Sequence, residues 1–407
     1  MQQDRRKFLR GVALGTGALA TGLPVLAKVT TNEEDRQEPA IDNGKQLFNM
    51  SGYAAPKIDN VRIAVIGLGM RGSDAVERLS YIEGAEIKVL CDKLPDRVEA
   101  AQKTLEKMGR PKAKGYSGED GWKALVENAD VDLIYNVTPW HLHAPISIAA
   151  MKNGKHAVSE VNAGLTVDQL WQLVETSERT RKHCIILENC CYDFFELLTL
   201  NMARQGLFGE IVHGEGAYIH TLLESNFAKD KYYDMWRLKE NFRNGNLYPT
   251  HGLGPVAQAL NINRGDKMDY LVAVSGNDFQ MAAMAKELAA KDDFYKPYLG
   301  KKFRGNMNTT TIRTNKGKTI MLQHDVTSPN VYSRIHKISG TKGSCLKYPE
   351  PGKIAFGHEG WIDEAEYKSL EEKYTAPIVR KVGEMAKQVG GHGGMDFLMD
   401  WRTIDCR

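Results

Sequence analysis

Three glycines and one aspartate are spaced as in a dinucleotide-binding site. The string Gly67-Leu-Gly69-Met-Arg-Gly72 lies between an apolar β-branched run and a helical pattern, and the next apolar run ends at Asp92. The first glycine permits a tight turn, the second lets a pyrophosphate approach the backbone, and the third lets the helix pack against the strand. A carboxylate at Asp92 can accept hydrogen bonds from both ribose hydroxyls and would repel a 2′-phosphate, which favours NAD over NADP. A structural turn with an incidental aspartate is the alternative.

His251 and Tyr332 are the candidate acid–base residues. Histidine titrates near neutral pH and can accept a proton from a substrate, and a tyrosine hydroxyl can also take part in proton transfer. His251 lies in the string Asn246-Leu-Tyr-Pro-Thr-His-Gly-Leu-Gly-Pro255, and Tyr332 follows Val331. A structural histidine and a core or sugar-stacking tyrosine are the alternatives.

Two further segments carry side chains that suit a polar ligand. Trp236 offers an apolar platform and Arg237 offers N–H donors, which together could bind a sugar, although an exposed salt bridge would use the same residues. The glycines of Gly390–Gly394 permit a tight loop around His392. That loop is compatible with a structural turn and with an active-site role.

The first half of the chain predicts a parallel sheet with intervening helices. The predicted strands are 61–66, 86–91, 131–137, 155–159 and 184–187, and the predicted helices are 144–153 and 167–180. Thr166 and Gln169 are placed to cap the second helix. Because ligands bind at the carboxyl ends of parallel strands, residues that follow these strands should converge on one crevice. They are Gly67, Asp92, Trp140, Glu160 and Asn189.

The pattern changes after Glu210 to alternating strands. The predicted strands are 211–220, 309–314, 319–325, 333–340, 344–348 and 353–356, with a helix at 254–260. The fold class is therefore α/β: an N-terminal Rossmann domain with a doubly wound parallel sheet (58–195), followed by an α+β domain with an open, mainly antiparallel sheet (196–407). The free face of the open sheet is a candidate surface for a substrate or for a homo-oligomer partner.

Composition and charge narrow the classes of partner. The 407 residues are 42% hydrophobic and 26% charged, as in an ordinary globular protein, with a net charge of +3. All of that net charge lies in the first 27 residues, and the rest of the chain has equal numbers of acidic and basic residues. Neither nucleic acid nor an anionic membrane is expected as a partner, and a neutral substrate is favoured. The six cysteines lack metal-ligand spacing, so we expect buried thiols and no metal.

The N-terminus has the features of an export signal. The basic string around Arg5 and Arg6 precedes a weakly apolar run that ends near Ala27, and no lipoprotein cysteine follows. This leader (1–27) resembles a twin-arginine signal, with a chance basic N-terminus as the alternative. The resemblance implies export to the periplasm of a folded protein without a membrane anchor. Residues 28–57 have no periodicity and are interpreted as an arm or linker.

The motifs together resemble the glucose–fructose oxidoreductase and inositol dehydrogenase superfamily, and within it glycoside hydrolase family 109. In the superfamily's dehydrogenases the strand that ends here at Glu160-Val161-Asn162 normally ends Glu-Lys-Pro, so the lysine that assists hydride transfer is absent. The strings that resemble family 109 are 246–255, 308–310, 323–328 and 390–396. The family pattern has proline at Asn162 and often Trp-Glu-Trp-His where this chain has Trp-His-Leu-His. Family members typically continue past the last residue here, so a C-terminal truncation is expected.

The resemblance assigns residues to a cofactor and to a sugar. The residues expected to contact NAD, including the glycines of the loop, are Gly67, Gly69, Met70, Arg71, Gly72, Asp92, Trp140, His141, Leu142, His143, Glu160, Val161 and Asn189. The residues that the resemblance implies contact the sugar are Tyr218, Arg237, Tyr248, Pro249, Thr250, His251 and Tyr332.

The resemblance also implies an activity. Family 109 is characterised by α-N-acetylgalactosaminidase activity on glycans with terminal α-GalNAc, run on a tightly bound NAD that is not consumed. The route comprises oxidation at C3, elimination across C1–C2, addition of water and re-reduction, with retention at C1, and NAD-dependent glycosidases are recognised exceptions to the two-carboxylate mechanism. The alternatives are an NAD-dependent sugar oxidoreductase with net cofactor turnover and a non-catalytic sugar-binding protein.

Overall fold

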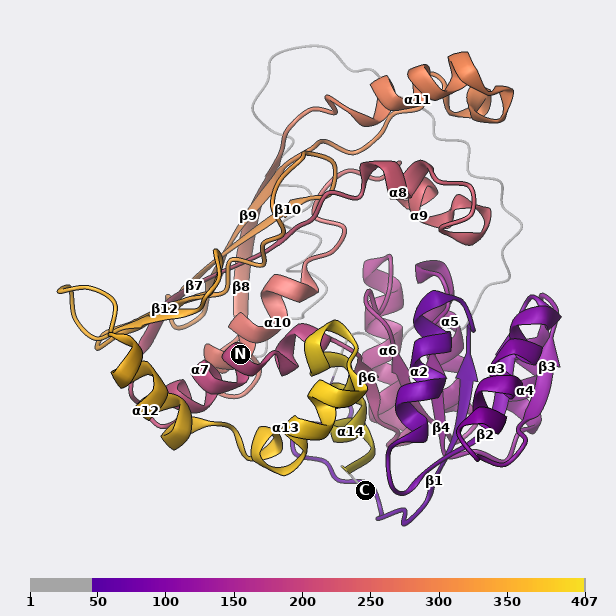
Figure 1. The fold of residues 1–407 in the computed structure, drawn as a ribbon, viewed down its shortest axis with the longest axis horizontal. Helices are drawn as coiled ribbons and strands as arrows, with labels where there is room; N and C mark the ends of the chain where they lie inside the picture. Colours follow the sequence, from indigo (N-terminus) through magenta and orange to yellow (C-terminus); the bar gives the residue numbers. More distant parts are fainter. Residues whose placement is uncertain (1–45, 406–407) are drawn as a thin grey trace.

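The computed structural model of the protein describes residues 46–405. The predicted export signal, residues 28–45 of the predicted arm and Cys406 lie outside the described residues. The described chain forms two sheets, each with helices packed on it (Figure 1). Among the described helices, none combines the length and the apolar character that a membrane span requires.

The first sheet is the predicted parallel, doubly wound sheet. Its strand order is β3-β2-β1-β4-β5-β6. The strands are β1 (Val61–Ile66), β2 (Ala85–Asp92), β3 (Lys114–Ser117), β4 (Leu133–Asn136), β5 (His156–Ser159) and β6 (Cys184–Ile186). The helices are α2 (Met70–Ser80), α3 (Pro95–Lys107), α4 (Gly121–Asn128), α5 (Trp140–Lys152) and α6 (Val167–Thr180). Side chains of α2 and α3 pack on one face, and those of α4, α5 and α6 pack on the other.

Two helices of this half show how local chemistry sets an element's start. Helix α6 has the predicted bounds, and Thr166 Oγ1 accepts a hydrogen bond from the Gln169 N–H at 3.1 Å. Helix α5 begins at Trp140, earlier than predicted, directly after Pro139. Proline fixes the backbone angle that suits a helix start. The early start places 140–143 in the first turn, at the carboxyl end of β4.

The second sheet is mixed and open. Its order is β13-β12-β11-β7-β10-β9-β8, in which β10 pairs with β7 in parallel and the other pairs are antiparallel. The strands are β7 (Ile211–Ile219), β8 (Met268–Ser275), β9 (Asn308–Thr314), β10 (Thr319–Asp325), β11 (Lys337–Gly340), β12 (Ser344–Leu346) and β13 (Lys353–Ala355). Helices α7 (Phe194–Arg204) and α10 (Thr250–Ala259) cover one face. On edge strand β8, Val272 is 61% exposed and Val274 is 68% exposed.

The structure differs from the predicted strands of this half in two places. The predicted strand 333–340 is a strand only over β11, because Ile335 and His336 have positive φ angles of 62° and 36° that interrupt pairing. Ser333 instead forms an isolated bridge with Ile219. Edge strand β8 was not predicted, because it is exposed and lacks a buried face that would impose alternation.

The C-terminal helices return to the first sheet. Helix α12 (Glu364–Tyr374) packs with the second core, whereas α13 (Pro377–Val389) and α14 (Met395–Asp405) lie against the Rossmann half (Figure 1). Phe397 and Leu398 of α14 are fully buried in the core that contains Ile63 and Leu79. The last helices of the chain are therefore placed to contribute side chains to the crevice at the end of the parallel sheet.

Candidate active site

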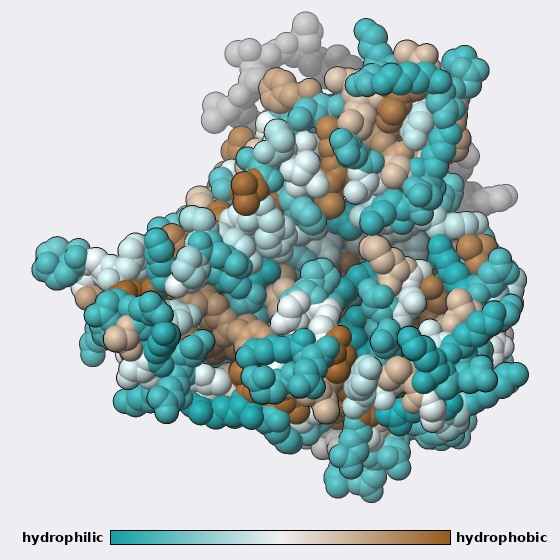
Figure 2. Space-filling view, viewed as in Figure 1, coloured by the Kyte–Doolittle hydropathy of each residue, from teal (hydrophilic) through white to brown (hydrophobic). Residues whose placement is uncertain are grey.

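One cleft of about 660 Å³ lies between the two halves. Figure 2 shows the surface hollowed between the two lobes of this face. The predicted residues in its wall are Gly67, Gly69, Met70, Arg71, Asp92, Trp140, His141, Leu142, His143, Glu160, Val161, Asn189, Tyr218, Arg237, Tyr248 and His251. Four predicted residues, Gly72, Pro249, Thr250 and Tyr332, do not line it. The structure thus brings most of the predicted cofactor and sugar residues into one cavity.

The glycine loop has the shape that a pyrophosphate requires. Gly67 has a φ of +91°, and a Cβ there would lie 2.6 Å from the Val137 carbonyl oxygen. A Cβ on Gly72 would lie 1.8 Å from the Gly67 oxygen, which explains its role in packing although it is not in the wall. At Gly69 the nearest atom would be Arg97 Nη1 at 3.4 Å, so space remains above the N-terminus of α2. Free N–H groups at a helix N-terminus bind phosphate.

Asp92 both holds this loop and faces the cleft. It is 6% exposed, and its two carboxylate oxygens accept hydrogen bonds from the Leu68 N–H at 2.7 Å and the Leu94 N–H at 2.9 Å. A carboxylate oxygen can accept more than one hydrogen bond, so both remain able to bind ribose hydroxyls. The open backbone at Gly69 and the acceptor at Asp92 fit an NAD without a 2′-phosphate.

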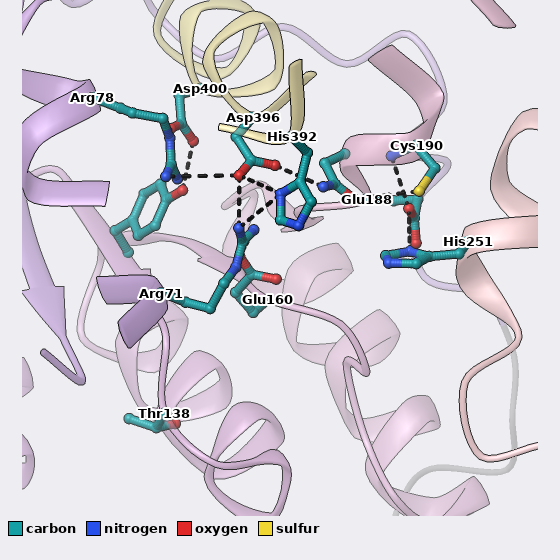
Figure 3. Close-up of polar contacts among 12 residues, drawn as sticks. Arg71, Arg78, Thr138, Glu160, Glu188, Cys190, His251, His392, Asp396 and Asp400 are labelled. Atoms are coloured by element: carbon teal, nitrogen blue, oxygen red, sulfur yellow. Dashed lines mark hydrogen bonds and ion pairs between the residues drawn. The ribbon is translucent and has the colours of Figure 1, made fainter. Parts of the chain in front are cut away.

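An ion network ties the C-terminal loop to the cofactor side of the cleft (Figure 3). Arg71 donates to Glu160 Oε1 and to Asp396 Oδ2, each at 2.6 Å. Asp396 also accepts from Asn189 Nδ2 at 2.7 Å and lies 2.9 Å from His392 Nδ1. Burial alone would raise the pKa of Asp396, but the hydrogen bond from His392 and the charge of Arg71 hold it well below its usual range. The network fixes the orientation of Arg71 at the start of α2.

His392 was considered as a site residue from the sequence but Asp396 was not, although both belong to one glycine-rich string. A second buried acid, Asp400, accepts from Tyr135 Oη at 2.5 Å and from Arg78 Nε at 2.8 Å. Acids at 396 and 400 are one helical turn apart on α14, on the face that packs against the parallel sheet. The spacing of the two acids is the feature of the sequence from which a shared buried face could have been predicted.

His143 lies in the wall but is held by backbone groups. Its two ring nitrogens lie 2.6 Å from the carbonyl oxygens of Thr138 and Asn162. Burial lowers the pKa of His143. The ring therefore joins the loops that follow β4 and β5, and supports the neighbouring wall residues.

On the sugar side, His251 is paired with Glu188, a buried carboxylate that was not among the predicted site residues. His251 Nδ1 lies 2.7 Å from Glu188 Oε1, and Glu188 is 5% exposed (Figure 3). Burial would raise the pKa of Glu188, but the charge and hydrogen bond of His251 hold it below its ordinary value. An ionised Glu188 accepts the Nδ1 proton, which leaves Nε2 of His251 as a proton acceptor in the cleft wall. Glu188 directly follows the predicted strand 184–187, and this position at the carboxyl end of a strand could have identified it as a site residue.

Close packing of α10 explains how His251 reaches Glu188. A Cβ on Gly252 would lie 2.3 Å from the Ala217 nitrogen of β7, and a Cβ on Gly254 would lie 2.9 Å from Glu188 Cγ. Glycine at both positions lets the first turn of α10 lie against the sheet and against Glu188. The string that was predicted to hold the base therefore contains the residues that position it.

The pair also resembles a metal-ligand set. Glu188, Cys190 and His251 place potential ligand atoms within 4.8 Å of one another. Burial and the charge of Glu188 raise the pKa of the Cys190 thiol, whereas cysteine binds metals as the thiolate. The chemistry of these groups fits a carboxylate–histidine pair better than a metal centre. Of the predicted buried thiols in the described chain, Cys91, Cys190, Cys191 and Cys345 are buried, and Cys184 is only half-buried.

Aromatic rings surround the remaining space. Tyr248 lies 4.7 Å from Tyr218 and 5.7 Å from Trp140, measured between ring centroids. The Arg237 guanidinium lies 5.5 Å from the rings of Trp140 and Tyr248. It packs among rings rather than forming the exposed salt bridge that was the alternative. Rings with a donor between them suit the apolar face and hydroxyls of a sugar.

Tyr332 lies behind this group. Its ring contacts Tyr218 at 6.4 Å and His220 at 5.2 Å, and its hydroxyl accepts from Arg334 Nη1 at 3.3 Å. Burial raises the pKa of Tyr332, although Arg334 opposes the shift. A raised pKa keeps the hydroxyl protonated near neutral pH, so it has a proton to donate.

The fold and the cleft define a class: an NAD-binding enzyme in which a Rossmann sheet faces a sugar-sized aromatic pocket. Residues 61–187 match the model of the oxidoreductase family with an NAD-binding Rossmann fold, and residues 192–407 match the glycosyl hydrolase 109 C-terminal domain. The chain belongs to glycosyl hydrolase family 109. It is thus an NAD-dependent, sugar-acting enzyme of a glycosidase family.

Relatives extend over most of the chain. A glycosyl hydrolase family 109 protein of Porphyromonas gingivalis is 47% identical, covering 91% of this chain and 80% of its own length. Glycosyl hydrolase family 109 protein 1 of Bacteroides fragilis is 46% identical, and the match covers 87% of this chain and 78% of the relative's own length.

Solved structures with 16% identity share the fold. Levoglucosan dehydrogenase in complex with NADH and L-sorbose has a TM-score of 0.60, covering 85% of this chain and 90% of that chain. Scyllo-inositol dehydrogenase from Lactobacillus casei with NAD(H) and scyllo-inositol has a TM-score of 0.55, and the match covers 85% of this chain and 95% of that chain.

Proposed function

We propose that the protein hydrolyses terminal α-N-acetylgalactosamine residues by transient oxidation of the sugar on an NAD that is not consumed. The observation that supports this most directly is that His251, which is paired with the buried Glu188, lies in the wall that also contains the dinucleotide loop. One cleft thus combines a proton acceptor, a sugar-sized aromatic pocket and a phosphate-binding turn.

Bound between the glycine loop and Asp92, NAD would supply a reversible hydride acceptor for C3 of the sugar, whose O3 proton passes to water, and the resulting C3 ketone would make the C2 proton acidic. The residues of the chain supply positioning and proton transfer. His251 Nε2 accepts the C2 proton of the oxidised sugar as the aglycone leaves C1, and Glu188 stabilises the resulting charge through Nδ1. Positioned acid–base groups typically contribute ~10²–10⁴-fold to rate.

Neighbouring side chains orient the sugar and assist departure of the aglycone. The Tyr218 hydroxyl stays protonated, because burial raises its pKa although Arg237 opposes the shift. It can donate a hydrogen bond to a sugar oxygen. Arg237 and the ring of Tyr248, which lie 5.5 Å apart in the cleft wall, would hold the sugar with C3 toward the nicotinamide. Water then adds to C1 on the face that the aglycone left, so we expect retention.

A chromogenic α-GalNAc glycoside tests the reaction. Purified protein should release the aglycone without accumulating free NADH. NADH formed in proportion to substrate would instead indicate the alternative, a sugar oxidoreductase with net cofactor turnover, which Val161 in place of the usual lysine disfavours. Neither product would indicate a sugar-binding protein.

Hydrolysis in D₂O tests the route. The released sugar should carry deuterium at C2, because the C2 proton leaves and is replaced in each turnover. Direct displacement by paired carboxylates does not exchange C2. An active enzyme whose product lacks C2 deuterium would contradict the redox mechanism while leaving the glycosidase activity intact.

A further inference from the structure

A segment of the second half lies over the cofactor end of the cleft. It comprises α8 (Leu223–Phe227), the turn Tyr233–Met235 and α9 (Trp236–Glu240), and Figure 1 shows α8 and α9 above the Rossmann helices. Its buried side chains Phe227, Met235 and Leu238 share a core with α11 (Met281–Lys291). The segment is thus anchored to the second half while its other side chains reach the cleft.

Trp236 and Arg237 of this segment contact Trp140 of the Rossmann half, and Tyr233 contacts the stretch that follows β2. The Tyr233 ring centroid lies 5.4 Å from Lys93 Nζ and 5.7 Å from Arg97 Cζ, and both cations belong to that stretch. All three residues line the cleft. Cations within about 6 Å of a ring centroid are attracted to its face. The backbone after Tyr233 is left-handed at Asp234 (φ 52°) and Met235 (φ 48°), a conformation that L-residues rarely adopt.

The two cations mark the adenosine side of the dinucleotide site. Arg97 Nη1 lies 3.7 Å from Asp92 Oδ2, the ribose acceptor, and is the nearest group to the open space at Gly69, where the pyrophosphate fits. Lys93 is also paired with Glu119 at 2.5 Å on the same rim. A dinucleotide bound between Asp92 and the glycine loop would therefore lie beneath the contact of Tyr233 with the two cations.

We propose that Tyr233, Lys93 and Arg97 form a latch across the adenosine end of the cleft and set the residence time of the cofactor. The dinucleotide can leave past Asp92 only when the ring separates from the cations. The inference rests on the proposed function in one respect: a cofactor that is returned to its starting state in each turnover does not need to leave. In this chain the latch would slow the release of the cofactor.

The rate of cofactor release tests the latch without any sugar. Holoenzyme reduced to the NADH form is mixed with excess NAD, and the loss of bound-NADH fluorescence gives the dissociation rate constant. Tyr233→Ala should release NADH about tenfold faster, equivalent to ~1.4 kcal/mol for two cation–π contacts. Tyr233→Phe, which keeps the ring, should stay within about twofold of the wild type. Tyr270→Ala is the matched control, since Tyr270 is 48% exposed on β8 and Tyr233 is 43% exposed.

A double-mutant cycle identifies the partners. Lys93→Gln with Arg97→Gln should accelerate release about as much as Tyr233→Ala, and the triple variant should be no faster than either. A wild-type rate in Tyr233→Ala, or a fast rate in Tyr233→Phe, would overturn the latch. Full additivity in the cycle would also overturn it. If Tyr233→Ala does not fold, the NADH release rates of the glutamine variants and of Tyr233→Phe still test the latch. Failure of the proposed function would show separately, as no aglycone release by the wild type.

Discussion

Replacing Glu188 by glutamine should slow turnover by about 10- to 100-fold while leaving NAD bound. The buried carboxylate accepts the His251 Nδ1 proton at 2.7 Å, and a hydrogen bond to a charged group contributes ~1.5–3 kcal/mol. At ~1.36 kcal/mol for each tenfold change in rate, the loss of that interaction gives the expected range. An amide can also donate to Nδ1, which would favour the tautomer that carries its proton on Nε2 and cannot act as a base.

The effect should hold across the neutral range. The charge and hydrogen bond of His251 keep the pKa of the buried Glu188 below its ordinary value of about 4.3. A carboxylate with a lowered pKa is ionised at every pH above its ordinary pKa. It loses its charge, and with it the interaction with His251, only as the pH falls through the lowered pKa. The ratio of wild-type to variant rate should therefore be constant between about pH 5 and pH 8 with respect to this carboxylate.

The assay is aglycone release under saturating substrate, with NAD content and melting temperature measured on the same samples. Glu178→Gln is the matched control, because Glu178 is also 5% exposed but accepts the Leu47 N–H at 2.8 Å, away from the cleft. His251→Ala should lose ~10²-fold or more, and the double variant with Glu188→Gln should lose little further, as expected for groups that act as a unit. A Glu188→Gln enzyme within twofold of the wild type would refute the reasoning.

Three further outcomes are expected. Asp92→Ala should lose NAD on gel filtration together with activity, because hydrogen bonds to ribose worth ~1.5–3 kcal/mol each are removed; full occupancy would contradict the assignment. Gly254→Ala should lower kcat more than NAD content, because the new Cβ would lie 2.9 Å from Glu188 Cγ; unchanged kcat would show that α10 can shift. We propose that the leader directs export, so changing Arg5 and Arg6 to Lys should retain the protein in the cytoplasm, as fractionation of expressing cells would reveal.

Features that depend on local sequence were predicted well. The turn at Gly67 and the start of α6 at Thr166 require particular residues at fixed short spacings, because backbone angles and end groups leave few alternatives. Buried strands such as β1 were predicted because a continuous apolar run records burial on both faces. Edge strands β3 (Lys114–Ser117) and β8 were not predicted, since exposed strands carry little hydrophobic pattern.

The sequence by itself determined the residue types of the site, the glycine turn and its acid, and the family resemblance that groups them. Only the tertiary structure decided which groups meet. Glu188 reaches His251 across 63 positions, and Arg71 reaches Asp396 across 325 positions. Such pairings depend on how helices pack on sheets, which no local spacing encodes. The state of each charge follows from the pairing, because burial and the facing group together set whether a carboxylate keeps its proton.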